Sequence, residues 1–216
     1  MYATTSYGNV LKYVNGVWIK LNGNVTTPSY CVNTIDCSGI NGLTADAGGN
    51  LYVSTTVGKV WKYSNGSWSQ LSGPAYDGTL DGTALSQIAI DGSGTLYTGS
   101  YGGTVWKYSS GSWTQINGGG SGGPAVDGDY RMIFAVAVDS SGYAYIGTEA
   151  GFVWRYTTGW SLVDGSGYLG TLDSTSDTPH PIYSITVDNS GNFYAAGDSG
   201  NVWMHSNTFP SSWTQF

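Results

Sequence analysis

The sequence predicts an all-β fold, a five-bladed β-propeller of four-stranded antiparallel blades, and three observations support this prediction. The composition is poor in helix formers, since Gly accounts for 34 of the 216 residues, Tyr for 17 and Trp for 9. Segments of similar sequence recur along the whole chain, and hairpin signals of the Asn-Gly type recur with them. Aromatic residues make up 14% of the chain, which is enough apolar surface for a folded core.

Five copies of one segment define the repeat. They read Gly8-Asn-Val-Leu-Lys-Tyr13, Gly58-Lys-Val-Trp-Lys-Tyr63, Gly103-Thr-Val-Trp-Lys-Tyr108, Gly151-Phe-Val-Trp-Arg-Tyr156 and Gly200-Asn-Val-Trp-Met-His205. The valine that they share recurs at spacings of 50, 45, 48 and 49 residues. A period in the forties made of short strands is typical of a β-propeller. Residues 1–216 are therefore predicted to form a single propeller domain that starts and ends inside a blade.

Each repeat divides into four strands, of which the first is the innermost. Short apolar segments predict inner strands at 43–47, 87–91, 135–139 and 184–188. An Asp-x-x-Gly turn follows each of them, and the first of these turns, at Asp46, is expected to be displaced or irregular. Second strands are expected at 2–6, 52–56, 97–101, 145–149 and 194–198.

The third and fourth strands form a hairpin in each repeat. The third strand carries the Val-Trp-Lys-Tyr motif, and a turn such as Asn15-Gly16 follows it, because Asn and Gly tolerate the positive φ that a tight hairpin needs. The fourth strand begins at Trp18, Trp68, Trp113, Trp160 or Trp213. Only four inner strands are visible, so the first blade is expected to lack one. The segment 25–36 and residues beyond either end are alternative sources for it.

Residues shared by the repeats are interpreted as scaffold. All nine Trp residues fall on repeat positions and are expected to fill the gaps between blades, each burying about 200 Å². The bases at one shared position are expected to pair with turn acids or carbonyl groups; they are Lys12, Lys62, Lys107 and Arg155. The repeated turn acids are expected to bind their own backbone. Calcium, the alternative for these turns, needs about six to eight oxygen ligands, more than one carboxylate per turn supplies.

The functional candidates are the residues that do not recur. A net charge of −7 argues against nucleic acid as the main partner and against an anionic membrane surface. No apolar run is long enough to predict a membrane-spanning helix. The loops that enter the inner strands and those that follow the second strands share one end of the blades, and long loops on a rigid scaffold commonly carry function. The predicted ligand-binding residues at this end are Tyr76, Asp77, Asp81, Tyr101, Asp127, Asp129, Tyr130, Arg131, Glu149, Asp173, His180 and Asp198.

Binding of a neutral carbohydrate is the favoured function, because carboxylates and Tyr hydroxyls bond sugar hydroxyls, whereas so many acids repel an anionic ligand. Two alternatives stay open. One is a glycoside hydrolase or lyase that uses paired carboxylates among Glu149, Asp198 and Asp129. The other is a scaffold for protein–protein interaction. No cofactor and no metal site is predicted, since His180 and His205 are the only histidines and no His/Cys cluster suits zinc.

Units of the form Val-Asp-x-x-Gly-x-x-Tyr-x-Gly followed by Val-Trp-Lys-Tyr resemble the repeats of bacterial extracellular propellers, both ligand-binding sensor propellers and Asp-box propellers of the sialidase type. The five-bladed arrangement is also similar to that of the lectin tachylectin-2, which binds N-acetylated sugars. Tyr63-Ser-Asn-Gly-Ser-Trp68 resembles an Asp box without its Asp, and the lectin's Gly-Gly-Trp is absent. The resemblance implies the fold and a recognition role. It does not imply the sialidase reaction, which needs an arginine cluster, whereas only Arg131 and Arg155 are present.

The two cysteines, Cys31 and Cys37, lie in a segment with the composition of a loop. The low Lys content and the abundance of Ser, Thr and Gly are typical of extracellular proteins, so a Cys31–Cys37 disulfide and a secreted location are expected, with two unpaired thiols as the alternative. The sequence contains no secretory signal, so an export signal is expected to have been removed.

Overall fold

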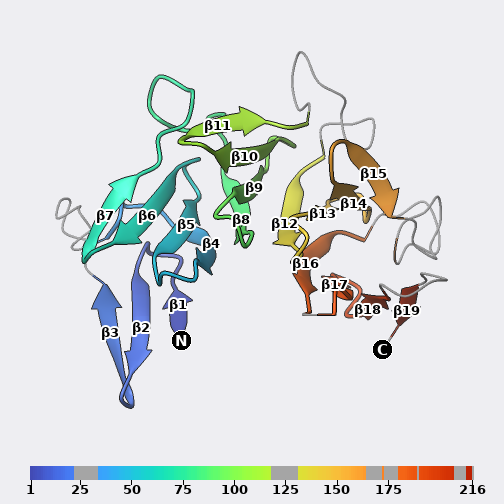
Figure 1. Ribbon diagram of the computed structural model, residues 1–216, viewed down its shortest axis with the longest axis horizontal. Helices are drawn as coiled ribbons and strands as arrows, with labels where there is room; N and C mark the ends of the chain where they lie inside the picture. The colour runs from blue at the N-terminus through green and yellow to red at the C-terminus, as the bar shows by residue number, and fades with distance from the viewer. Residues whose placement is uncertain are drawn as a thin grey trace. The chain divides into compact units, whose positions relative to one another are not determined.

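The computed structural model describes residues 1–21, 34–117, 131–163, 172, 180–188, 190–206 and 213–215. Every element of regular secondary structure within these residues is a β-strand (Figure 1). This part of the chain holds no helix with the length and apolar character needed to cross a membrane. The chain divides into two compact units, Met1–Ile88 and Ala89–Phe216.

The strands form five antiparallel sheets, and in each sheet the order in space follows the order in sequence. Blade 1 contains β1 (Tyr2–Thr4), β2 (Val10–Val14) and β3 (Val17–Leu21). Blade 2 contains β4 (Ile40–Ala45), β5 (Leu51–Thr55), β6 (Val60–Ser64) and β7 (Ser67–Gln70). Blade 3 contains β8 (Leu85–Ile90), β9 (Leu96–Ser100), β10 (Val105–Ser109) and β11 (Ser112–Gln115).

Blade 4 contains β12 (Ile133–Val138), β13 (Ala144–Thr148), β14 (Val153–Tyr156) and β15 (Trp160–Val163). Blade 5 contains β16 (Ile182–Val187), β17 (Phe193–Gly197), β18 (Val202–His205) and β19 (Trp213–Gln215). These sheets confirm the predicted all-β, five-bladed β-propeller. In the described residues blade 1 has three strands and lacks an inner one, as the repeat pattern indicates.

The strands lie slightly earlier in the sequence than predicted. The inner strands start two or three residues before the expected positions, because each extends past a β-bulge or a buried apolar residue that periodicity alone did not include. They end before the repeated Asp, because that residue belongs to the turn: the N–H of Asp46, for example, donates to the carbonyl oxygen of Asn50 at 3.0 Å. The second strand ends two residues early in blade 1 and one residue early in blades 2 to 5, so Tyr101, Glu149 and Asp198 directly follow a strand.

The Asp-x-x-Gly turns are alike in blades 2 to 5. In each turn the N–H of the Gly donates to the carbonyl oxygen of the Asp, at 3.0 Å for Gly49 and Asp46. The expectation of an irregular turn at Asp46 is therefore wrong. The carboxylates accept bonds from their own turn, which confirms their predicted scaffold role: Oδ1 of Asp46 accepts from the N–H of Asn50 at 2.9 Å, and Oδ1 of Asp139 accepts from that of Ser141 at 2.9 Å.

In three blades the other carboxylate oxygen of this Asp binds a Tyr hydroxyl of the following strand. Oδ2 accepts from Tyr52 at 3.0 Å, from Tyr145 at 3.0 Å and from Tyr194 at 3.2 Å. We call this arrangement the turn clamp: the repeat Asp bound both to the backbone of its turn and to the Tyr of the second strand. It explains the spacing Asp-x-x-Gly-x-x-Tyr, since the turn places the two side chains together.

The repeated lysines do not pair as expected. They lie over Tyr rings on the neighbouring strand, with Nζ to ring-centroid distances of 5.8 Å for Lys12 over Tyr2, 5.5 Å for Lys62 over Tyr52 and 5.8 Å for Lys107 over Tyr97. Each Lys is the direct cross-strand partner of its Tyr. The predicted pairing of these lysines with turn acids is therefore wrong. The register of the second and third strands places each Lys opposite the aromatic ring of a Tyr.

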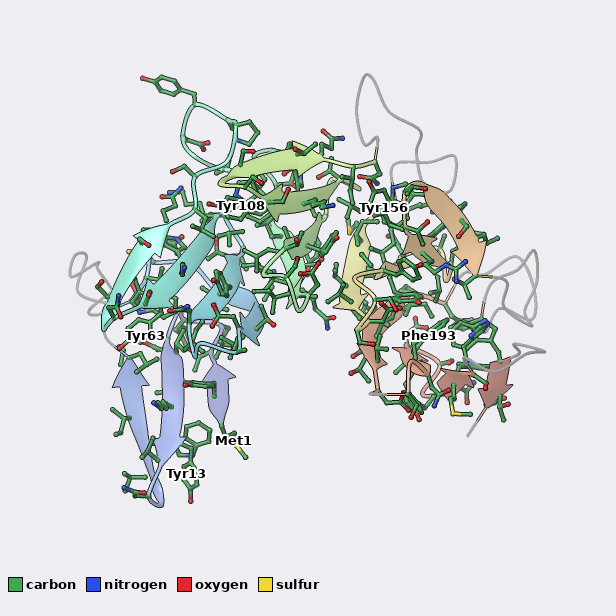
Figure 2. The ribbon with its side chains drawn as sticks, in the orientation of Figure 1. Met1, Tyr13, Tyr63, Tyr108, Tyr156 and Phe193 are labelled. Atoms are coloured by element: carbon green, nitrogen blue, oxygen red, sulfur yellow. The ribbon has the colours of Figure 1, made fainter. Side chains whose placement is uncertain are left out.

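The tryptophans of the fourth strand pair with the last Tyr of the third strand. Ring centroids lie 5.0 to 5.2 Å apart in blades 1 to 4, and Figure 2 labels the tyrosines, which are Tyr13, Tyr63, Tyr108 and Tyr156. Trp68, Trp106, Trp113 and Trp203 are buried as expected, whereas Trp61 and Trp154 are only half-buried. Trp18 departs from the expectation, because 47% of its side-chain surface is exposed.

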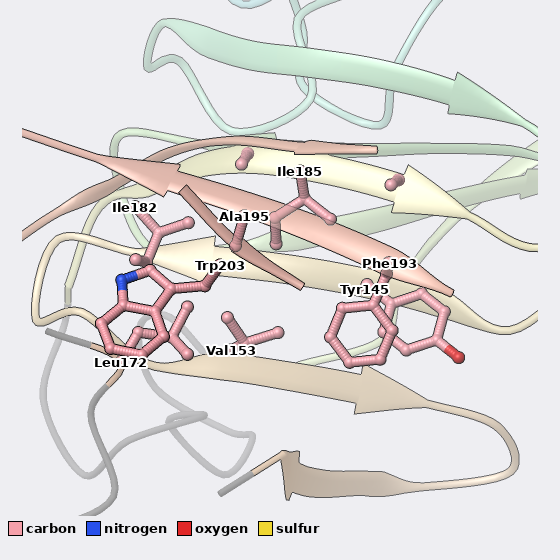
Figure 3. Packing of buried hydrophobic residues seen from close by; sticks show 10 residues of the cluster. Tyr145, Val153, Leu172, Ile182, Ile185, Phe193, Ala195 and Trp203 are labelled. Carbon is pink, nitrogen blue, oxygen red and sulfur yellow. The ribbon is translucent and has the colours of Figure 1, made fainter. Parts of the chain in front are cut away.

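The largest described core of the second unit lies between blades 4 and 5 (Figure 3). Blade 4 contributes Tyr145 and Val153, and blade 5 contributes Phe193 and Trp203. His205, which stands where other repeats have Tyr, stacks on Phe193 with ring centroids 4.5 Å apart. Burial lowers the pKa of His205 below its usual value. This histidine is therefore a neutral packing residue.

Candidate ligand-binding site

Blades 4 and 5 share one backbone arrangement at the end where their inner strands begin. The N–H of Glu149, directly after β13, donates to the carbonyl oxygen of Met132 at 2.9 Å. In blade 5 the N–H of Asp198, directly after β17, donates to the carbonyl oxygen of Pro181 at 3.3 Å. These bonds hold the residue after the second strand against the residue before the inner strand. Glu149 and Asp198 therefore occupy equivalent positions in their blades.

Arg131 and His180 are equivalent in the same way. Each directly precedes the residue whose carbonyl accepts this bond. Both blades thus present one basic and one acidic side chain at matching positions. All four of these residues were predicted as site residues, and the structure arranges them as one set per blade.

A β-bulge lies beside each set. The pairing of β12 with β13 shifts register between Ile133 and Ala135, and the pairing of β16 with β17 shifts between Ile182 and Ser184. The residues skipped are Phe134 and Tyr183. A bulge residue leaves the ladder of the strand, so the side chain is directed differently from those of its neighbours. Blade 2 has the same shift between Ile40 and Gly42.

The bulge residues bring three aromatic rings into contact. The rings of Tyr101 and Phe134 have centroids 5.5 Å apart in an edge-to-face arrangement, and those of Phe134 and Tyr183 have centroids 5.1 Å apart. The exposed fraction is 40% for Tyr101 and 50% for Tyr183. We call these three residues, from three successive blades, the aromatic strip. Rings that stay exposed in contact with one another offer a surface on which a ligand can stack.

The structure also pairs two of the predicted site residues directly. Nδ1 of His180 lies 3.0 Å from Oδ1 of Asp198, and the two side chains are 32% and 41% exposed. A side-chain pair with this much solvent contact contributes little to stability. Its polar atoms are instead accessible for binding, and Tyr183 lies three residues beyond His180.

Two of the predicted site residues of the first unit, Asp77 and Asp81, form hydrogen bonds within their own loop. Oδ1 of Asp77 accepts bonds from the N–H of Thr79 at 3.1 Å and from its hydroxyl at 2.7 Å. Oδ1 of Asp81 accepts the same pair of bonds from Thr83, at 3.0 and 2.7 Å. The hydroxyl of Thr79 holds the pKa of Asp77 below its usual value. Both carboxylates therefore build their own loop, and Tyr76 is fully exposed on it.

Several expected residues lie outside the described part of the chain. They are Asp127, Asp129, Tyr130 and Asp173 of the site, and Cys31 of the predicted disulfide. Cys37 is described: its φ is 64°, and its N–H donates to Oγ1 of Thr34 at 3.2 Å. The Cys31–Cys37 bond remains a prediction. Among the described residues no group of three or more His, Cys, Asp and Glu side chains could hold a metal ion.

Phe134 and Tyr183 were missed from the sequence, although a signal for them exists. The position before them is apolar in each of the four inner strands, as Ile40, Leu85, Ile133 or Ile182, whereas their own position holds Asn, Ser, Phe or Tyr. When one position varies between repeats and the position before it is always apolar, the fold does not require a particular side chain at the variable position. The β-bulge at this position is visible only in the structure.

No family model matches the chain, and no curated protein matches it. Among solved structures, virginiamycin B lyase from Staphylococcus aureus is similar with a TM-score of 0.68 and 10% identity, over 100% of this chain and 68% of the lyase. The extracellular domain of a hybrid two-component system from B. thetaiotaomicron is similar with a TM-score of 0.67 and 17% identity, over 96% of this chain and 26% of that one.

The WD40 β-propeller domain of Doa1 is similar with a TM-score of 0.67 and 9% identity, over 97% of this chain and 61% of that one. This chain thus spans only about a quarter of the two-component system domain. Identities this low show the fold alone, which is a β-propeller. The resemblance to Asp-box propellers and to tachylectin-2 remains an expectation from the sequence.

Proposed function

We propose that this chain is an extracellular recognition propeller that binds a neutral carbohydrate on the aromatic strip. The single observation that carries the proposal is the contact of Tyr101, Phe134 and Tyr183 from three blades, with two of these rings substantially exposed. Sugars present apolar C–H faces that stack on aromatic rings. Their hydroxyls require hydrogen-bonding groups at the edge of such a platform.

The polar residues beside the strip supply those groups. Asp198 and His180 lie together at a distance of 3.0 Å, and Glu149 occupies the equivalent place in blade 4. Carboxylates accept bonds from sugar hydroxyls, and an imidazole both donates and accepts. The net charge of −7 disfavours an anionic ligand, so the proposed sugar is uncharged.

An extracellular location belongs to the proposal. It is supported by the low Lys content of the chain. A similar fold also accounts for 26% of the extracellular domain of the two-component system described above. A lectin-like role is favoured over chemistry, because a glycosidase holds its two carboxyl groups in a pocket, whereas Asp198 is exposed and its carboxylate lies 3.0 Å from His180.

A glycan array with the purified protein tests the proposal. We expect neutral glycans to bind and sialylated or sulfated glycans not to bind. Tyr183→Ala should reduce the signal about tenfold, because one stacking surface is lost. Tyr143→Ala is a matched control, since Tyr143 is similarly exposed, at 41%, but lies in the turn at the opposite end of blade 4.

Two outcomes would overturn the proposal. The first is the absence of any glycan binding by a folded protein. The second is equal loss of binding in Tyr143→Ala and Tyr183→Ala, which would place the ligand elsewhere. Turnover of a bound glycan that disappears in Glu149→Gln would replace it with the glycoside hydrolase or lyase alternative.

A further inference from the structure

We infer that the aromatic strip contains two equivalent subsites, one in blade 4 and one in blade 5, and recognises a chain of at least two linked neutral sugars. This inference rests on the proposed function and adds the length of the ligand to it. The inference depends on the equivalence of blades 4 and 5, on the contact between them, and on the chemistry of the residues that each blade contributes.

The two sets match residue by residue. The blade 4 subsite consists of Arg131, Phe134 and Glu149, and the blade 5 subsite consists of His180, Tyr183 and Asp198. In each set a basic residue lies three positions before the bulge, an aromatic residue occupies the bulge, and an acid directly follows the second strand.

The scaffold does not require this arrangement. In blade 2 the same three positions hold Ser38, Asn41 and Thr56, and they serve the fold. The amide of Asn41 donates to the carbonyl oxygen of Leu85 at 2.7 Å, and Oγ1 of Thr56 accepts from the N–H of Gly39 at 3.1 Å. The bulge therefore tolerates a small polar residue. The needs of the fold do not explain why blades 4 and 5 have aromatic and charged residues at these positions.

The backbone brings the two subsites into contact. A Cβ placed on Gly147 of β13 would lie 2.6 Å from Cγ2 of Ile182, the residue before Tyr183, so only glycine permits this close approach of the two blades. The rings of Phe134 and Tyr183 are in contact across the same two blades, with centroids 5.1 Å apart. Two stacking surfaces that touch suit two adjacent rings of one ligand.

The backbone places an aromatic, a basic and an acidic residue at the same end of each of the two blades, and these are the kinds of group that bind one sugar. A monosaccharide occupies one subsite at a time. When two sugars are linked, binding of the first raises the effective concentration of the second at the neighbouring subsite, so affinity rises without any new type of contact.

Isothermal titration with maltose-series and cellobiose-series glucans of increasing length tests the inference. We expect the disaccharide or trisaccharide of at least one series to bind about tenfold or more tightly than glucose. Phe134→Leu and Tyr183→Leu should each abolish this gain and leave an affinity similar to that for glucose. These variants keep apolar bulk, so that folding is preserved. Tyr183→Phe keeps the ring and should retain most of the gain, and Tyr143→Leu should retain all of it.

The failures of the two proposals are distinguishable. If glucose binds as tightly as its oligomers, the tandem subsites are wrong while carbohydrate binding stands. If Tyr183→Leu removes binding and Phe134→Leu changes nothing, a single subsite in blade 5 replaces the pair. If no neutral sugar in either series or on the array binds, the inference falls together with the proposed function.

Discussion

Trp18 and Trp68 occupy the same position in successive repeats and make the same contact with a Tyr of their own hairpin, with centroids 5.1 Å apart in both cases. Their surroundings differ, since Trp68 is 5% exposed in a core with Val10 and Leu51, whereas Trp18 is 47% exposed. A residue type at a repeat position therefore does not determine burial. Burial is determined by the residues that pack against the position, and these belong to the neighbouring blade.

This pair gives a stability prediction. Trp68→Ala should lower the free energy of unfolding by about 3–5 kcal/mol, because it removes a large side chain from a packed core. Trp18→Ala should cost less than about 1 kcal/mol, since nearly half of that surface already contacts water. Both changes remove one Tyr–Trp pair, so the difference isolates burial between blades. Chemical denaturation measures it, and equal costs would contradict the assignment of Trp68 to the core.

The repeated turn acids make stability depend on pH. The amide of Asn50 donates to Asp46 at 2.7 Å, and this bond is the main reason why the pKa of Asp46 lies below its usual value. In the same way the amide of Asn192 lowers the pKa of Asp188. Because these pKa values are lower in the folded than in the unfolded protein, the stabilisation is present above the ordinary Asp pKa of about 3.9 and is lost as the pH falls through the folded values.

We therefore expect the Tm deficit of Asn50→Ala to be largest near neutral pH and to shrink as the pH falls below about 4. Asn41→Ala is the control. Its amide donates to the backbone carbonyl of Leu85, which does not titrate, so its deficit should stay constant with pH. Differential scanning calorimetry across this range measures both. A deficit of Asn50→Ala that does not change with pH would refute the role of the charged carboxylate.

At the scale of strands, close approaches explain which glycines are needed. A Cβ on Gly42 of β4 would lie 2.6 Å from the backbone nitrogen of Ile88 and 2.9 Å from Cα of Gln87. These are backbone atoms of β8, which do not yield as the end of a flexible side chain does. Gly42 thus sets the distance between the inner strands of two successive blades, next to the bulge at Asn41.

Gly42→Ala should accordingly destabilise the protein by about 1–3 kcal/mol, as overpacking of a tight site does. Gly92→Ala provides the comparison, because a Cβ there has no atom within 4 Å and no positive φ is recorded for that residue. It should change stability by less than about 0.5 kcal/mol. Urea denaturation of the two variants decides the matter, and a neutral Gly42→Ala would show that the blades can move apart at no cost.

The segment before β4 carries the predicted Cys31–Cys37 bond. Protein produced under oxidising conditions should react with no thiol reagent until a reductant is added, and mass spectrometry after alkylation measures this. Reduction should then cost about 2 kcal/mol, since the bond closes a short loop. Complete alkylation of both residues without a reductant would contradict the bond.

At the scale of the whole molecule, the sequence was sufficient for the fold because the fold is periodic. The spacing of the shared valines, the Asp-x-x-Gly turns and the Asn-Gly hairpins each predict the same four-stranded unit, and the strands lie within a few residues of their expected positions. The left-handed φ values of 50° at Asn15 and 51° at Asn65 confirm the hairpin signals. Each of these turns and hairpins depends on residues close together in the sequence, so they can be predicted from the sequence alone.

The candidate site could be predicted only in part, because it depends on residues that do not repeat and on contacts between different blades. Glu149, Asp198, Arg131 and His180 were predicted as site residues because they break the repeat, and the structure places them at matching positions in blades 4 and 5. Phe134 was missed, since its importance depends on a shift of register and on rings supplied by two other blades. Asp77 remains a predicted site residue, and the structure adds a role that the sequence did not indicate, since its carboxylate accepts two bonds from Thr79 of its own loop.

The turn clamp has a consequence for how such chains change over evolutionary time. Asp46 and Tyr52, or Asp139 and Tyr145, are six residues apart, so the clamp lies within one repeat and needs nothing from another. A duplicated or exchanged segment therefore arrives with the means to close its own turn. Mutation can then accumulate at the other end of the unit, where the bulge residue is free to change from Asn to Phe or Tyr. A new specificity can be acquired there while the inherited turn keeps its shape.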